Sequence, residues 1–74
     1  MNNQRRERIS NIIDRIRDVA NELENILNEE ESVFDNIPEN LQNSRRGEES
    51  QEAIDYITEA VAALDNAIEQ LEEI

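Results

Sequence analysis

The stretch EAIDYITEAVAALDNAIEQLE, residues 52–72, contains three consecutive seven-residue repeats and decides the fold. Each repeat has an alanine at its second position and larger apolar residues at its third and sixth positions. Apolar residues that alternate three and four positions apart lie on one stripe of an α-helix, and a sustained period of seven favours left-handed packing against another helix. The repeats therefore predict a long helix that packs on a helical partner. Its expected seam consists of Ile54, Ile57, Val61, Leu64, Ile68 and Leu71, flanked by a column of Ala53, Ala60, Ala67 and Ile74.

The first half of the chain has the same spacing and predicts a second long helix. We expect its seam at Ile9, Ile12, Ile16, Val19, Leu23, Ile26, Glu30, Val33 and Ile37. A second apolar column, spaced by seven, lies beside that seam and consists of Ile13, Ala20, Leu27 and Phe34. Glu30 is the one charged residue in the seam, which indicates a role in helix register or a place at the rim near the connector.

Between the two helices lies DNIPENLQNSRRGEES, residues 35–50. Pro38 has no amide hydrogen and disfavours helical geometry at the residue before it, so the first helix should end near residue 35 or 36. We expect Asn36 to cap a short turn at PENLQ and Leu41 to fold back over the hairpin end, near Phe34 and Ile37. The expected ranges are 3–36 for the first helix, 37–44 for the connector and 45–73 for the second helix.

The start of the second helix has two candidate N-caps, Ser44 and the alternative Ser50. If Ser44 is the cap, Gly47 lies on the same stripe as Ile54 and Val61. The missing side chain at Gly47 would then let the connector or the first helix approach closely.

These elements predict an all-α fold: one domain, residues 1–74, that forms an antiparallel two-helix hairpin with coiled-coil-like packing at a crossing near +20°. A lone pair of helices needs only two apolar columns, whereas both helices here have three. We therefore expect two hairpins to form a homodimeric four-helix bundle, with a trimer, a hetero-complex or a monomer as the alternatives. The predicted self-association core is Ile9, Ile12, Ile13, Ile16, Val19, Leu23, Ile26, Leu27, Val33, Phe34, Ile54, Ile57, Val61, Leu64, Ile68 and Leu71.

The net charge of −12 is unevenly distributed along the chain. Residues 1–21 have a net charge of +2, whereas residues 22–39 and 48–74 together contain sixteen acidic residues and no basic one. In an antiparallel hairpin, three arginines of the first turns should face three acids at the C-terminal end: Arg5, Arg6 and Arg8 opposite Glu69, Glu72 and Glu73. The first turns of the longer first helix should also project beyond the second helix. The candidate partner contacts are Arg5, Arg6, Arg8, Arg45, Arg46 and Tyr56.

The absence of histidine and cysteine argues against catalysis and against metal or cofactor binding. Zinc fingers and His- or Cys-dependent nucleophilic systems need those residues, and a di-metal bundle needs two histidines and several inward glutamates. DNIPENLQNSRR does not have the spacing of a calcium loop, and one glycine is too few for a phosphate loop. We predict a protein that is not an enzyme. There is no run of 18 apolar residues, so we expect no membrane association and a cytoplasmic location.

The segment from residue 34 to residue 74 resembles a group of small uncharacterised acidic proteins of bacteriophages, prophages and related bacterial mobile elements. The residues that carry the resemblance are Phe34, Asp35, Asn36, Pro38, Glu39, Leu41, Gln42, Ser44, Arg46 and Gly47, followed by the heptads. Phe34 stands where that group would have tyrosine. The resemblance implies a phage or mobile-element origin, hence the cytoplasm of a bacterial host, and no settled activity.

Three functions remain open. The first is a protein-binding module that inhibits or modulates a host protein acting on nucleic acid or in defence, by presenting carboxylates where phosphates would bind. The second is a structural or assembly role, as a scaffold in a virion or replication complex. The third is direct nucleic-acid binding by the arginine-containing helix start, which the acidic field and the lack of stacking aromatics disfavour.

Overall fold

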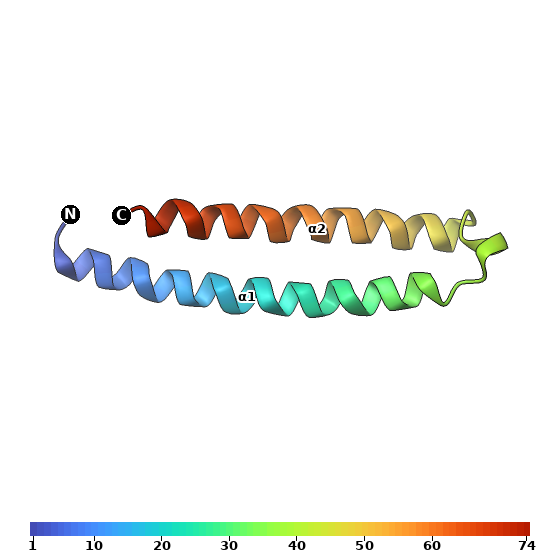
Figure 1. The fold of residues 1–74 in the computed structure, drawn as a ribbon, viewed down its shortest axis with the longest axis horizontal. Coiled ribbons are helices and arrows are strands. Elements are labelled where there is room, and N and C mark those ends of the chain that lie inside the picture. The colour runs from blue at the N-terminus through green and yellow to red at the C-terminus, as the bar shows by residue number, and fades with distance from the viewer.

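The computed structural model describes all 74 residues as an all-helical, antiparallel hairpin (Figure 1). Helix α1 spans Asn3–Asp35, the short 3-10 helix η1 spans Glu39–Leu41 and helix α2 spans Arg45–Glu72. The two long helices lie side by side in a rod of 58 × 15 × 13 Å. The helix ends lie within one residue of those predicted from the sequence. No helix in the hairpin combines the length and the apolar character needed to span a membrane.

The end of α1 follows from Pro38, as predicted, but the predicted cap at Asn36 is wrong. The Asn36 amide donates to the Ser32 carbonyl at 3.1 Å, which closes the last turn of α1. The 3-10 helix instead begins after Pro38, whose carbonyl accepts from the Leu41 amide at 2.7 Å, and no side chain caps it. The fixed φ of proline suits a residue that precedes a tight turn, so a side-chain cap is not required there.

Helix α2 begins at the predicted N-cap, Ser44, whose Oγ accepts a hydrogen bond from the Gly47 amide at 3.5 Å. Gly47 is buried, and a Cβ atom built on it would overlap the carbonyl group of Gln42. Its φ is not positive, so glycine is needed here for space and not for backbone conformation. The predicted close approach of the connector is therefore confirmed.

The seam between the helices matches the prediction in α2, where Val61 and Ile68 are buried and the other seam residues are partly buried. In α1 the prediction is half wrong, because the column that contains Ala20 faces α2 in place of the column that contains Val19. The observed α1 seam is Ile9, Ile13, Ile16, Ala20, Leu23, Leu27, Glu30, Phe34 and Ile37.

The error has a physical cause. The column at residues 9, 16 and 23 has an apolar column on each side, and either choice gives alternating steps of three and four. One partner helix can cover only two columns. In the structure the second column is that of Ile13, Ala20, Leu27 and Phe34, since Ala20 is buried and the other three are partly buried.

The resulting core is small for a chain of this length. Its buried apolar residues are Ala20, Ile37, Val61 and Ile68, and no large side chain is completely buried. A single core in a chain below about 70–80 residues rarely contributes more than about 3–5 kcal/mol without further support. The hairpin therefore has much to gain from covering its remaining apolar surface.

Candidate interaction surfaces

The exposed apolar residues of α1 form a straight stripe, Ile12, Val19, Ile26 and Val33, that we call the α1 stripe. Their exposed fractions are 44%, 48%, 47% and 43%. Residues seven apart lie on the same side of a helix in coiled-coil packing. The stripe is therefore one continuous band about 30 Å long, and it coincides with the column that sequence reasoning had assigned to the helix–helix seam.

Helix α2 contributes a second column to the same side of the hairpin. Ile12, Ile16 and Val19 line a groove of about 320 Å³ together with Leu64 of α2, so the α1 stripe lies on the Leu64 side of the seam. Ala60 and Ala67, four residues before and three after Leu64, lie beside it on the far side from Val61. We call the α1 stripe and the column of Ala53, Ala60 and Ala67 together the apolar face. Ile74, which the sequence pattern assigns to the same column, follows the end of α2 and lies instead in a pocket with Ser10 and Glu72.

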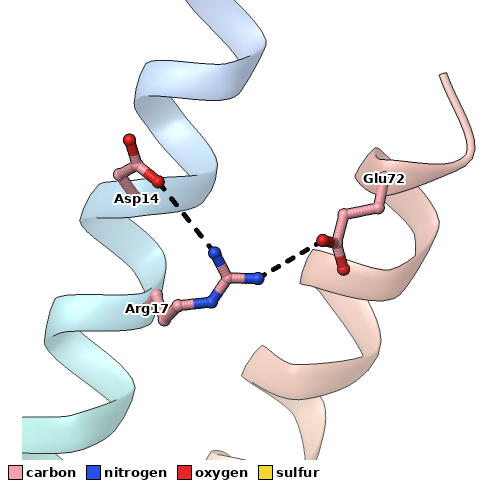
Figure 2. Close-up of polar contacts among 3 residues, drawn as sticks. All are labelled: Asp14, Arg17 and Glu72. Carbon is pink, nitrogen blue, oxygen red and sulfur yellow. Dashed lines mark hydrogen bonds and ion pairs between the residues drawn. The ribbon is translucent and has the colours of Figure 1, made fainter.

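The opposite side of the hairpin is polar. By the same heptad geometry it carries Ser10, Arg17, Glu24 and Glu31 from α1 and Gln51, Thr58, Asp65 and Glu72 from α2, all of them exposed. Figure 2 shows Arg17 there, reaching from α1 towards Glu72 on α2. The Arg17 guanidinium lies 3.3 Å from the Glu72 carboxylate and 4.0 Å from that of Asp14. The hairpin is therefore amphipathic as a whole, with one apolar and one charged side.

This ion pair corrects the predicted pairing of Arg5, Arg6 and Arg8 with the acidic end of α2. None of those arginines forms an ion pair with α2. The prediction matched residues by their level along the rod, but helical side chains lean towards their own N-terminus. In an antiparallel pair, the N-terminal arginines of α1 therefore lean past the end of α2, and the acids of α2 lean back towards the connector. An arginine two turns further along, Arg17, meets them instead.

A polar contact lies inside the seam close to the connector. The Ser50 Oγ donates to the Glu30 Oε1 at 2.8 Å, and Ser50 is only 5% exposed. Glu30 thus has a partner across the helices, in agreement with its predicted role in register near the connector. Sequence reasoning considered Ser50 only as an alternative cap. The signal that it missed is that Ser50 continues the seam column of Ile57 and Leu64 by one more heptad.

The connector forms a pocket of about 400 Å³ at the closed end of the hairpin. We call it the connector pocket. Its lining residues are Val33, Asn36, Ile37, Pro38, Leu41, Ser44 and Arg46. The Gln42 side chain donates to the Ile37 carbonyl at 3.3 Å and helps to hold the turn. Leu41 folds back beside Ile37 as predicted but remains 49% exposed. The pocket adjoins the apolar face, because Val33 belongs to both.

The opposite, open end carries the predicted N-terminal overhang, since the first turns of α1 project beyond the end of α2 (Figure 1). Arg5 and Arg8 line a shallow pocket of about 180 Å³ there with Met1, Ile9 and Ile12. The other candidate contacts are dispersed. Arg45 pairs with Glu49 of its own helix at 3.1 Å, and Tyr56 is 65% exposed.

Four further residues of α1, Arg8, Arg15, Glu22 and Glu29, form a column that we call the charged rim. Each precedes a residue of the α1 stripe by four positions, so the rim lies beside the stripe on the side away from α2. Arg15 lines the same groove as Ile12 and Val19, which agrees with this placement. The rim is basic towards the open end and acidic towards the connector.

The acidic residues do not gather into a metal site: nowhere do three or more lie close enough together to hold a metal ion. Comparison with known proteins adds no relative, since no family model, no curated protein and no solved structure matches the chain. The resemblance to phage and mobile-element proteins therefore stays a prediction.

Proposed function

We propose that this protein is a non-enzymatic protein-binding module that works as a homodimer, in which two hairpins join their apolar faces into a four-helix bundle. The observation that carries the proposal is the α1 stripe, four residues with nearly equal exposure along one line. Burial of apolar surface contributes about 25 cal/mol per Å². A stable interface needs roughly 800 Å² from each partner, and a side of 58 × 15 Å is large enough to supply it.

A second copy of the chain is a suitable occupant for this face. Three apolar residues in seven is the pattern of a helix inside a bundle, and two identical faces related by a two-fold axis cover one another completely. Repulsion between two chains of charge −12 opposes association. Salt screens exposed charges beyond about 8 Å at physiological ionic strength, and the apolar faces keep most acidic residues away from the interface.

The outer surface of such a bundle is the proposed partner-binding surface. It would carry most of the sixteen acids that lie in the two segments without a base. A surface of this charge attracts basic proteins and can occupy sites that normally bind phosphates. The corresponding partner is a nucleic-acid-acting or defence protein, in keeping with the resemblance to phage proteins and a bacterial cytoplasmic setting.

A scaffold or assembly role is the second candidate. The observation that favours it is the difference between the two ends of the rod, one with the connector pocket and one with the arginine overhang. Two unlike ends can hold two unlike partners at a set separation. Copurification with particles or a replication complex would favour this role over inhibition.

Dimerisation is tested by replacing Val19 and Ile26 with asparagine. Both side chains are half exposed in the hairpin, so the loss should fall on the dimer, which we expect to dissociate at least about 100-fold more readily. Light scattering across a concentration series measures the change. Thr58→Asn, on the exposed polar side of the hairpin, is the matched control. A wild-type chain that remains a folded 8.6 kDa monomer at high concentration would exclude the bundle.

Partner binding is tested with immobilised wild-type dimer and a variant in which the outer acids Glu52, Glu59 and Glu69 become glutamine. The wild type should retain nucleic-acid-binding proteins from a bacterial lysate at low salt and release them to added duplex DNA. The glutamine variant should retain much less. Retention that is insensitive to salt and to DNA would contradict phosphate mimicry and leave the scaffold role.

A further inference from the structure

The charged rim of α1 changes sign along its length, and this gradient carries information about how two copies meet. Arg8 and Arg15 occupy the half near the open end, and Glu22 and Glu29 occupy the half near the connector. The rim borders the α1 stripe, so it lies at the edge of any interface that covers the stripe. A column with this gradient complements a copy of itself only when the copy runs in the opposite direction.

Two faces of this kind can join in two ways that keep a two-fold axis. In one, the connectors are at the same end and α1 lies on α2 of the second copy. In the other, the connectors are at opposite ends and α1 lies antiparallel on α1 of the second copy. We propose that the protein adopts the second arrangement, in which the N-terminal turns of each α1 cover the connector pocket of the other copy. The proposal rests on the dimer proposed above and specifies its geometry.

Coverage of the stripe sets the register. All four members are covered when Ile12 faces Val33 of the second copy and Val19 faces Ile26 of the second copy. The two α1 helices are then separated by β-branched side chains and the two α2 helices by alanines. Both separations fit the range of about 8–10 Å at which helices pack.

Charge favours this arrangement over its alternative. At this register Arg15 lies opposite Glu29 of the second copy, twice by symmetry, while Glu22 lies opposite Glu22 of the second copy at the two-fold axis and Arg8 lies beyond the last acid of the facing rim. The two attractive pairs outnumber the one repulsive pair. The Glu30–Ser50 contact and the Ile16–Leu64 groove show which residues of α1 and α2 lie at the same height along the rod. With both connectors at one end, the rim of α1 faces a column of α2 in the second copy. No acid of that column then lies opposite Arg8 or Arg15, and Glu29 lies near Glu49 of the second copy. That column consists of Glu49, Tyr56, Ala63 and Gln70.

The two ends of the hairpin also fit one another. The middle of the stripe lies between Val19 and Ile26, beyond residue 19, the middle of α1. Antiparallel pairing about that point carries the N-terminal turns, with Arg5 and exposed Met1, over the half-exposed Leu41 of the second copy. The arrangement therefore covers exposed apolar side chains at both ends of the hairpin, Met1 at the open end and Leu41 at the closed end.

Cysteine cross-linking tests the geometry directly, because the chain contains no cysteine. Ile12→Cys and Val33→Cys proteins are prepared separately, mixed to allow subunit exchange, and oxidised. We expect a cross-linked dimer from the mixture and none from either protein alone, because two Ile12 positions would be about 30 Å apart. The mixture of Ile12→Cys with Ala67→Cys tests the alternative arrangement. Ile12→Cys with Tyr56→Cys is the control for random collisions.

The outcomes separate this inference from the proposed function. Absence of a dimer by light scattering overturns the dimer itself. A dimer that cross-links through Ile12 and Ala67, or through neither pair, overturns only the antiparallel arrangement. Cross-linking through Ile12 and Val33 alone supports it.

A second measurement does not depend on cysteine. The double variant Arg8→Glu/Arg15→Glu should weaken the dimer by at least about tenfold at low salt, because acid then faces acid along both rims. Adding Glu22→Arg and Glu29→Arg reverses the whole gradient and should restore the wild-type dissociation constant. Failure of the fourfold variant to recover, with helicity unchanged by circular dichroism, would overturn the antiparallel arrangement.

Discussion

The closed and open ends of the hairpin are built in different ways. At the closed end, the connector backbone packs directly on Gly47, Ser44 caps α2, and Ser50 donates to Glu30 inside the seam. At the open end, the polar contact between the helices is a single ion pair of two half-exposed side chains, Arg17 and Glu72, beside the apolar seam. Interactions that exclude water contribute more than exposed ion pairs. The polar contacts at the connector end should therefore contribute more stability than the one at the open end.

The largest expected effect comes from Gly47→Ala, at the closed end. Alanine in a helix usually stabilises relative to glycine, by roughly 0.5–1 kcal/mol. Here its Cβ would overlap the Gln42 carbonyl, and we expect a loss of about 3 kcal/mol in the free energy of unfolding. Urea denaturation followed by circular dichroism measures the loss. Arg45→Ala, at the exposed start of the same helix, is the control, and a gain in stability at position 47 would contradict the observed packing.

Ser50→Ala should have a smaller effect at the same end. It removes the donor to Glu30 and leaves a partly buried carboxylate without its partner, at a cost of about 1–2 kcal/mol. Replacing both residues by apolar ones, Glu30→Leu with Ser50→Ala, should recover most of that loss. Denaturation of the two single variants and the double variant forms a thermodynamic cycle. Strictly additive losses would show that the hydrogen bond does not couple the helices.

The smallest effect is expected at the open end. Arg17→Ala should lower the free energy of unfolding by no more than about 0.5 kcal/mol, and the difference should diminish as salt is added. Arg6→Ala is the matched control, since the Arg6 side chain bonds only to the carbonyl of Met1, just before its own helix, at 3.3 Å. A loss at Arg17 as large as that at Ser50 would remove the contrast between the two ends.

Most of the connector could be predicted, because its residues act through short-range rules, although the Asn36 cap was predicted incorrectly. Pro38 ends a helix, Ser44 caps one, and Gly47 leaves space, whatever the rest of the chain does. The side of α1 that faces α2 was not predictable in the same way. The residues on both sides of the Ile9 column are apolar, so which of the two columns faces α2 is a property of the tertiary structure.

The ion pairs were predicted incorrectly for a related reason. Charge along the sequence indicates which ends attract one another, but the reach and lean of each side chain decide which atoms meet. Arg17 and Glu72 meet because their side chains converge, whereas Arg5 and Arg8 lean beyond the end of α2. The candidate surface itself was foreseen from the third apolar column, although its residues on α1 were assigned to the wrong role.

Every member of the α1 stripe is branched at Cβ. Such side chains have essentially one rotamer in a helix, so they are held rigid before any partner arrives and lose little freedom on contact. Long, flexible side chains such as methionine would instead reshape themselves around many different surfaces. The exposed band of this hairpin consequently behaves as a stiff template, selective for a complementary shape and poorly suited to promiscuous attachment.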